Sequence, residues 1–454
     1  MATITIKNVG PIEEILNLEL NKVNVFMGPQ SSGKSTIAKI ISYCTWVEKK
    51  ASLTQSFTEI DFINELVVFH KLKGYFRNDS SLEYESDIIK FKYDHGKGQP
   101  HFEWKNRYDF KRSKISYIPA ERNLVSAIEN WFDVRFKENN FLNFMKEWED
   151  ARKIYTKTSP LTILELGVQY YYDEKSGQDF VIVDNKGTTL ELANTSSGLQ
   201  SAIPFIVITE YITVRIYEKV NIKRSVRDEQ IEHFIKEKIY NDLFRENNQT
   251  RDIPADGEKQ PIGIESNVPW RAEINPSKPI QHTVNQQEIQ ENNWLHIFTS
   301  EEKQKKYNEK TDCFLNTQYT QFIIEEPEQN LFPETQRDLV YYLLEKLQSE
   351  KEHRLTITTH SPYILYALNN CMMGGLVKEQ IKDKKLKEEF LNNEFLSKNS
   401  WINPQLVSIW EIEEGKIKRI QDKDNIISEN YFDQKMTEIT DEYYQILNYY
   451  NDEE

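Results

Sequence analysis

Near its start the chain reads Val23-Asn24-Val25-Phe26-Met27-Gly28-Pro29-Gln30-Ser31-Ser32-Gly33-Lys34-Ser35-Thr36. The apolar run 23–27 predicts a buried strand of a parallel sheet, and the residues after Lys34 predict a helix. The stretch between them fits the pattern GxxxxGK[ST]. Glycines let backbone N–H groups curl around phosphate oxygens, and a helix N-terminus attracts anions. We therefore expect a phosphate-binding loop, in which Lys34 neutralises phosphate charge and the Ser35 hydroxyl binds Mg²⁺.

Two later motifs each follow a short apolar strand. The first strand, around 321–324, ends in Glu325 and Glu326. We expect Glu325 to hold Mg²⁺ and Glu326 to orient or activate the attacking water. The second strand, 355–359, is followed by His360, which we expect to contact the γ-phosphate or the lytic water. A solvated strand end is the alternative for the carboxylates, and a structural role is the alternative for His360.

A fourth motif is the segment Asn194-Thr195-Ser196-Ser197-Gly198-Leu199-Gln200. It precedes a strongly apolar helix that we expect at 202–217. A Ser-Gly helix start offers a second anion-binding N-terminus, and a plain helix cap is the alternative.

Together these motifs resemble those of the ABC-type ATPases, in the branch shared by the SMC and recombination-repair ATPases and the OLD-like nucleases. Ser197, Gly198 and Gln200 match the ABC signature LSGGQ, whereas Ser196 and Leu199 depart from it. In that family the signature acts on the nucleotide of the opposite subunit. The resemblance therefore implies two bound ATP molecules, each with Mg²⁺, sandwiched in a homodimer, which can be part of a higher oligomer.

Two more segments extend the resemblance. The segment 327–333 looks like the Pro-Glu-x-x-Leu-x-Pro segment of OLD-like ATPases. The segment 117–122 resembles their PxER segment, which implies that Arg122 lies near the nucleotide or couples it to a helical subdomain. A structural salt bridge is the alternative for Arg122.

The predicted fold class is α/β: an ABC-type P-loop ATPase head with an antiparallel β subdomain, a mixed central sheet flanked by helices, and a helical, loop-rich insertion. We assign the split head to 1–218 and 318–425, the insertion to 219–317, and an acidic C-terminal helix to 426–454. The pattern also predicts an antiparallel sheet at 80–105 and a β-hairpin around 175–177. Further helices are predicted at 57–75, 123–158, 224–248 and 332–349, and two strands at 406–420.

Composition limits the remaining possibilities. The 454 residues hold 57 Lys and Arg against 72 Asp and Glu, a net charge of −15, which excludes a simple basic nucleic-acid coat. Three dispersed cysteines make a disulfide framework or a thiolate zinc site improbable. The N-terminus lacks a signal-peptide pattern, and the longest apolar run is too short to span a bilayer. The sequence predicts a soluble protein of the reducing cytoplasm without a membrane partner.

Three functions remain open. The resemblance extends to the ATPase subunits of bacterial anti-phage systems such as PARIS and Septu. It implies a nucleotide-gated sensor and scaffold for a separate effector protein, a nuclease or a toxin, because no nuclease module is recognised in this chain. The alternative is a DNA-clamp ATPase, for which 111–114 and 223–227 are candidate basic segments. An ABC-type ATPase with another regulatory role is the third possibility.

Overall fold

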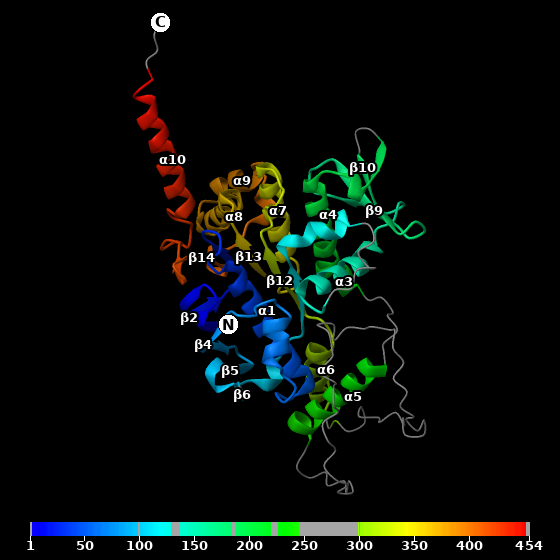
Figure 1. The fold of residues 1–454 in the computed structure, drawn as a ribbon. Coiled ribbons are helices and arrows are strands. Elements are labelled where there is room, and N and C mark those ends of the chain that lie inside the picture. The colour runs from blue at the N-terminus through cyan, green and yellow to red at the C-terminus, as the bar shows by residue number, and fades with distance from the viewer. Residues whose placement is uncertain are drawn as a thin grey trace.

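Three β-sheets and ten α-helices organise the described part of this computed structural model (Figure 1). The structure describes residues 2–98, 100–128, 137–183, 187–218, 226–245, 298 and 300–450. The fold is α/β, with one mainly parallel sheet and two antiparallel sheets.

The central sheet carries the strands that the sequence motifs follow. Its strands run in the order β15-β14-β3-β13-β12-β7, and every pair is parallel except β14 with β15. Their bounds are β3 Val23–Met27, β7 Ser113–Ile118, β12 Tyr319–Glu325, β13 Arg354–Thr359, β14 Val407–Glu413 and β15 Lys416–Arg419. All residues of β3, β7 and β12 are buried, as expected for strands of a parallel sheet that is covered on both faces. Parallel strands meet at one edge, so the ends of β3, β13 and β12 are neighbours.

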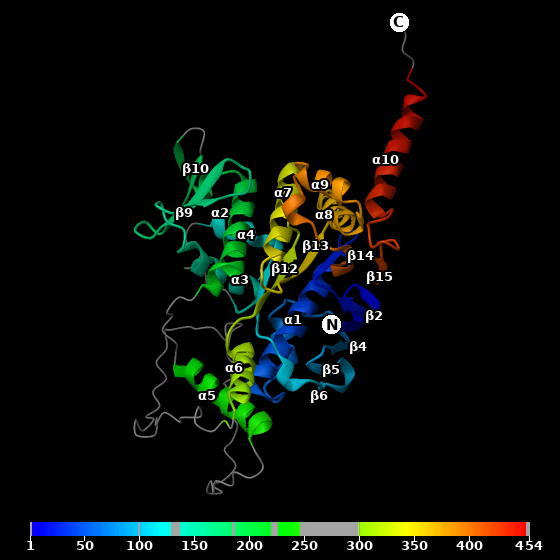
Figure 2. The same cartoon turned by 180° about the vertical axis from the view of Figure 1, so that it is seen from behind.

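The two antiparallel sheets are separate layers. The five-stranded sheet has the order β2-β1-β4-β5-β6, with β1 Ala2–Val9, β2 Ile12–Leu20, β4 Phe76–Glu85, β5 Ile89–Asp94 and β6 His101–Trp104. The four-stranded sheet has the order β11-β10-β9-β8, with β8 Leu161–Thr162, β9 Val168–Asp173, β10 Gln178–Val183 and β11 Thr188–Glu191. Figures 1 and 2 show the latter in a lobe on the far side of the central sheet from β2.

Helices separate and cover these sheets. They are α1 Lys34–Thr54, α2 Leu124–Ala127, α3 Asn140–Arg152, α4 Ser197–Thr213, α5 Val226–Ile239, α6 Glu301–Leu315, α7 Pro333–Leu347, α8 Pro362–Gln380, α9 Lys384–Asn392 and α10 Tyr431–Leu447. One apolar cluster joins α1 to the five-stranded sheet and to one face of the central sheet. A second cluster joins α3, α4, α7 and α8 to the other face. The helix after the glycine-rich loop is thus held between two sheets.

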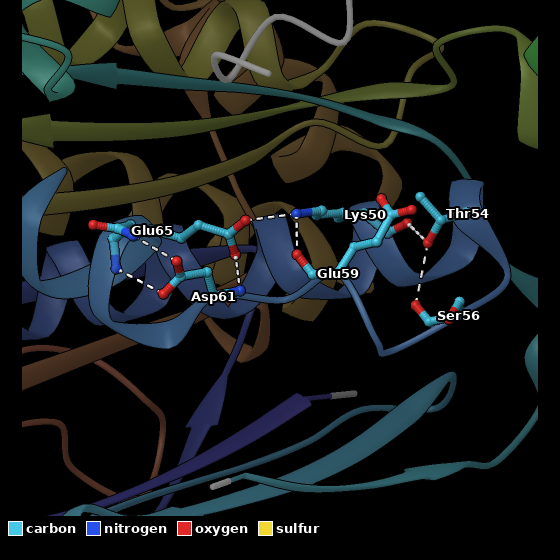
Figure 3. Close-up of polar contacts among 7 residues, drawn as sticks. Lys50, Thr54, Ser56, Glu59, Asp61 and Glu65 are labelled. Atoms are coloured by element: carbon cyan, nitrogen blue, oxygen red, sulfur yellow. Dashed lines mark hydrogen bonds and ion pairs between the residues drawn. The ribbon is translucent and has the colours of Figure 1, made fainter. Parts of the chain in front are cut away.

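The C-terminal end of α1 is tied to the segment that follows it (Figure 3). Lys50 Nζ donates to the carbonyl of Glu59 at 2.5 Å and pairs with Glu65 Oε1 at 2.6 Å. Glu65 Oε2 in turn accepts from the Asp61 N–H at 3.1 Å. By donating to these two groups, Lys50 fixes the C-terminal end of α1, the helix whose N-terminal end follows the glycine-rich loop.

Several element predictions differ from the structure in extent. Within the expected helix 57–75 the structure has one short π-helix, Ile63–Val68. The expected helix 123–158 resolves into α2 and α3, and residues 129–136 lie outside the described residues. Helix α6 lies within the predicted helical, loop-rich insertion 219–317, although no individual helix is predicted at 301–315 because that segment is strongly polar. Its apolar side chains Tyr307 and Phe314 are buried in the α1 cluster, so this part of the predicted insertion packs on the body. Residues 246–297 lie outside the described residues.

Helix α4 belongs to the core. The helical stretch Ser197–Tyr217 is long and apolar enough to cross a membrane, and it is the one such helix among the described residues. Its residues Ile203, Val207 and Ile208 are completely buried in the cluster shared with α3 and α7. Burial against other protein elements accounts for its apolar composition.

Candidate active site

The loop between β3 and α1 depends on its glycines. Gly28 has φ 142°, and a Cβ there would lie 2.4 Å from the carbonyl oxygen of Ile412. Gly33, the N-cap of α1, has φ 109°, and no side chain caps the helix. Both conformations favour glycine. The first N–H groups of an α-helix lack intrahelical partners, so the start of α1 offers donors to an anion.

Lys34 lies inside this loop. Its side chain is 4% exposed, and its Nζ donates to the carbonyls of Gly28 at 2.9 Å and Pro29 at 2.6 Å. Burial lowers the pKa of Lys34 to about 8, against the opposing influence of the Glu326 and Glu328 carboxylates. A buried cation whose partners are mainly neutral carbonyls is suited to receive a phosphate.

Glu325 ends β12 directly beside the loop. Its carboxylate accepts from the Tyr117 hydroxyl at 2.6 Å, and a hydrogen bond from Ser35 also reaches it. Burial raises the pKa of Glu325, whereas the charge of Lys39 and these two hydrogen bonds act to lower it. The structure therefore brings together the hydroxyl and the carboxylate that the sequence predicts as Mg²⁺ ligands.

Glu326 and His360 meet across the ends of β12 and β13. His360 Nε2 lies 3.4 Å from Glu326 Oε1, and both side chains are about one-third exposed. The hydrogen bond from His360 lowers the pKa of Glu326, and the charges of Lys34 and Arg122 act in the same direction. A carboxylate kept ionised beside an imidazole can accept a proton from a water molecule.

Glu328, the glutamate of the Pro-Glu-x-x-Leu-x-Pro segment, connects the same two strand ends, a role that the sequence does not assign to it. Its Oε1 accepts from the backbone N–H of His360 at 2.6 Å. Burial raises the pKa of Glu328, and this hydrogen bond acts to lower it. Glu328 therefore positions the backbone from which the His360 side chain extends.

Arg122 lies behind the carboxylates. It is 1% exposed, and its guanidinium donates to the carbonyls of Glu325 at 3.0 Å, Glu326 at 2.8 Å and Pro327 at 3.0 Å. Burial lowers the pKa of Arg122 to about 10. Its donors thus hold the backbone of the carboxylate segment, so the structure supports a positioning role rather than direct contact with a nucleotide.

The signature-like segment lies at the start of α4. Ser196 caps this helix by accepting from the Leu199 N–H at 3.4 Å, and Ser197 is exposed. The Gln200 amide donates to two carbonyls of its own turn, those of Ala193 at 2.8 Å and Thr195 at 3.1 Å. These contacts shape the turn and leave the Ser197 side of the helix start open.

The helix start of α4 also packs on the loop between β12 and α7. A Cβ on Gly198 would lie 3.0 Å from the carbonyl oxygen of Asn330, and the Asn330 amide donates to Ser201 Oγ at 3.0 Å. Asn330 has φ 62°. The signature-like segment is therefore in direct contact with the loop that follows β12, the strand whose end carries the proposed catalytic residues.

The remaining predicted loop residues differ in exposure. Gln30 and Ser31 are exposed, Pro29 and Ser32 are partly buried, and Thr36 is 4% exposed within the first turn of α1. Ser31 has φ 62°, which places it in the left-handed region. The exposed part of the loop is thus its tip, and the part nearest α1 is packed.

These residues fit ATP and Mg²⁺. Uncapped helix N–H groups and Lys34 suit phosphate oxygens, and the Ser35 hydroxyl beside Glu325 offers two hard oxygen ligands. Mg²⁺ in phosphate sites takes one or two protein ligands and completes its shell with phosphate and water. Among the described residues, there is no group of three or more His, Cys, Asp or Glu that could hold a metal ion.

Two contacts of the site could be found only in three dimensions. Tyr117 occupies a buried position of β7, and its hydroxyl reaches the Glu325 carboxylate on the neighbouring strand. Glu328 belongs to the Pro-Glu-x-x-Leu-x-Pro segment, but that segment gives no sign that its carboxylate reaches the His360 N–H. The sequence offers only a weak signal that Tyr117 lies near the site, because its strand runs directly into the PxER-like segment.

Comparison with known proteins gives fold likenesses only. No family model matches the chain, and no curated protein matches it. Among solved structures it is similar to the SMC head domain from Thermotoga maritima, with 8% identity and a TM-score of 0.33 over 80% of this chain and 90% of that one. It is also similar to the Smc head domain bound to the C-terminal domain of ScpA from Pyrococcus furiosus, with 7% identity and a TM-score of 0.34 over 97% and 99%.

A third similar structure is the recombination mediator protein RecF with ATP, with 10% identity and a TM-score of 0.27 over 92% of this chain and 98% of that one. Identities and TM-scores this low do not identify a function.

Proposed function

We propose that this chain is a Mg²⁺-dependent ATPase of the ABC type that acts as a nucleotide-gated switch. One observation carries the proposal: Lys34 in its loop, the Ser35–Glu325 pair and the Glu326–His360 pair gather at the neighbouring ends of β3, β12 and β13. Phosphate-binding, metal-binding and proton-accepting groups thus face one place, as ATP hydrolysis requires.

Each residue has a distinct role in this proposal. Lys34 and the N–H groups of the loop bind the β- and γ-phosphates, and Ser35 with Glu325 holds the metal. When bound, Mg²⁺ neutralises charge that develops on the phosphate oxygens. Glu326 orients the attacking water and accepts its proton, and His360 keeps Glu326 ionised and directed. Arg122 and Glu328 position the backbone of these two groups.

The signature-like residues complete a second chain's site in the proposed cycle. Ser197 and Gly198 of one subunit reach the γ-phosphate bound to the other, and Gln200 keeps their turn in shape. The exposed start of α4 and its packing on Asn330 support this role. ATP binding closes the head-to-tail dimer, and hydrolysis reopens it.

Two variants test the hydrolytic assignment. Lys34→Ala removes the buried cation, and we expect it to abolish ATP binding in a fluorescence titration. Glu326→Gln removes the proton acceptor and keeps the shape. We expect it to bind ATP normally and to lower kcat by about 10²-fold or more, since general-base catalysis contributes at that level.

The control is Lys423→Ala, an exposed lysine between β15 and α10, which should leave binding and turnover unchanged. Normal ATP turnover by Glu326→Gln would remove that carboxylate from the mechanism. Unimpaired ATP binding by Lys34→Ala would reject the whole site.

As the cellular role we propose a scaffold for a separate effector, a nuclease or toxin, in bacterial anti-phage defence. This extension rests on the resemblance of the motifs. The alternative of a DNA clamp needs a basic surface, and one of its candidate segments is engaged internally. Lys111 pairs with Glu352 at 2.8 Å, and Lys114 pairs with the buried Glu147 at 3.0 Å. The other candidate, 223–227, has no described side chains.

A further inference from the structure

A buried tyrosine lies beside the proposed metal site. Tyr117 is on β7, the outermost strand of the central sheet next to β12, and its hydroxyl donates to Glu325 Oε1 at 2.6 Å. Tyr117 is 2% exposed. Its pairing with Ile323 places its ring on the same face of the sheet as Glu325, two residues further along β12. The hydroxyl therefore contacts one of the two oxygens that Glu325 can offer to a metal ion.

The surroundings of Tyr117 hold its ring in place. It belongs to the apolar cluster that joins α1 to the five-stranded sheet, and its ring meets the buried His70 ring edge-on, with centroids 5.6 Å apart. On the other face of β7, Ser116 Oγ donates to Glu147 Oε2 on α3 at 2.6 Å, and Lys114 pairs with Glu147 Oε1 at 3.0 Å. Strand β7 is thus fixed from both faces, although β12 is its one neighbour among the described strands.

The bond from Tyr117 limits how the Glu325 carboxylate can turn. Glu325 is 6% exposed, so its carboxylate has little room of its own. Groups that hydrogen-bond a metal ligand fix its orientation, and their loss costs about 10- to 100-fold in metal affinity. The choice between Mg²⁺ and Ca²⁺ depends on ligand flexibility, because Mg²⁺ demands a near-octahedral set of ligands and Ca²⁺ accepts a larger, irregular one. A carboxylate held in one orientation therefore favours Mg²⁺.

We propose that Tyr117 is a positioning residue that makes the site select Mg²⁺ over Ca²⁺ by fixing the Glu325 carboxylate. This inference rests on the ATP and Mg²⁺ site proposed above, and it adds a residue that acts only through Glu325. Without the hydroxyl, the Glu325 carboxylate loses its donor on β7 and is free to turn toward a larger ion. The site then still binds a metal nucleotide, but it discriminates less between the two ions.

Binding of a fluorescent, non-hydrolysable ATP analogue to the full chain tests this role without measuring turnover. The Kd of the analogue is determined in excess MgCl₂, in excess CaCl₂ and in EDTA. For Tyr117→Phe we expect the Kd in Mg²⁺ to rise about tenfold, because a metal ligand has lost its supporting hydrogen bond. The Kd in Ca²⁺ should change much less, so the ratio of the Kd in Ca²⁺ to the Kd in Mg²⁺ falls. The Kd in EDTA should be unchanged, because the glycine-rich loop is intact.

Tyr84→Phe is the matched control. Tyr84 is also buried in the same apolar cluster, and its hydroxyl donates to Glu48 Oε2 at 2.9 Å, a carboxylate of α1 outside the site. The control removes the same kind of hydrogen bond and should keep all three wild-type Kd values. Tyr117→Met lacks the hydroxyl too, in a flexible side chain that adapts to the space, and should give the same lower ratio. This second variant decides the question if circular dichroism shows that Tyr117→Phe does not fold.

The possible outcomes separate this inference from the proposed function. A wild-type ratio in the Tyr117 variants would overturn the inference, and an equal fall in Tyr84→Phe would attribute the effect to packing. A Kd in EDTA that rises as much as the Kd in Mg²⁺ would show damage to the loop instead of the metal site. Equal wild-type Kd values in Mg²⁺ and Ca²⁺ would reject the selectivity but keep the ATP site. A wild-type protein that binds no analogue under any condition would reject the ATP site itself, and this inference with it.

Discussion

At Glu326 the backbone takes a conformation that few non-glycine residues adopt, with φ 45°. Such a residue costs of order 1–3 kcal/mol unless its surroundings compensate. Here the Glu326 N–H donates to the carbonyl of Thr358 at 2.9 Å, and the Arg122 guanidinium donates to the carbonyl of Glu326 at 2.8 Å. These bonds turn the Glu326 side chain out of the strand direction toward His360, so the strain is part of how the proposed base is aimed.

The buried lysine of the loop should make the proposed nucleotide binding depend on pH. Lys34 has its pKa lowered to about 8 in the free protein, chiefly by burial, and a bound phosphate anion raises it again. Above pH 8 the lysine must therefore take up a proton when ATP binds. We expect the Kd to rise by up to about tenfold per pH unit above pH 8. Calorimetry in buffers of different ionisation enthalpy should show uptake near zero at pH 6.5, approaching one proton at pH 9.

Lys34→Arg is the matched control for this pH dependence, because a guanidinium stays charged throughout the range. It should bind ATP without proton uptake from this position. A wild-type protein that takes up no proton at pH 9 would show that Lys34 keeps its charge in the free loop.

At the scale of elements, the carboxylate of Glu328 joins the loop after β12 to the end of β13. Glu328→Ala leaves the His360 N–H unpaired, and we expect a loss of about 1–3 kcal/mol in the free energy of unfolding. The backbone that carries the His360 side chain is then no longer held in place. We therefore expect kcat to fall about 10- to 100-fold with little change in KM. Glu328→Gln retains an acceptor oxygen and should recover most of the kcat. Equal kcat in the Ala and Gln variants would contradict the positioning role.

The sequence predicted the elements whose signals are local. The apolar runs gave the core of β3, β12 and β13, and the glycine pattern gave the loop before α1 with its lysine. The insertion was predicted to be helical and loop-rich, but no helix was placed at 301–315, because its few apolar residues stand in a strongly charged segment. That helix is stabilised by tertiary packing rather than by its own pattern, because Tyr307 packs against Tyr240 after α5, and Phe314 packs against Phe110.

The supporting contacts of the site could not be predicted in the same way. The register of β7 against β12, which pairs Tyr117 with Ile323, decides which hydroxyl reaches Glu325. Likewise Arg122 acquires its partners only when a short helix from the first half of the chain packs beneath the end of β12. Such contacts depend on how distant segments are aligned, which a single sequence does not state.

At the scale of the whole molecule, we expect the nucleotide bound to the proposed switch to determine whether a partner protein binds. We expect tagged Glu326→Gln protein, purified from its native host and treated with nuclease, to retain a stoichiometric nuclease- or toxin-sized protein in mass spectrometry. The ATP-bound state persists in this variant because hydrolysis is blocked. Lys34→Ala is the matched control for nucleotide-dependent capture. Nucleic acid as the sole retained partner would reject the scaffold role and favour the DNA clamp.

The strand order of the central sheet also has a consequence for how the chain is made. Strand β3 emerges early from the ribosome, yet both of its neighbours, β13 and β14, come from the last quarter of the sequence. During most of translation its two edges have no native partner, and closing such long loops makes folding slow. The glycine-rich loop is likewise made long before the carboxylates at 325–328 that lie beside it in the folded chain. The ATP hydrolysis proposed for this site therefore depends on segments made late in synthesis, and the apolar β3 segment is exposed to aggregation until its neighbouring strands are made.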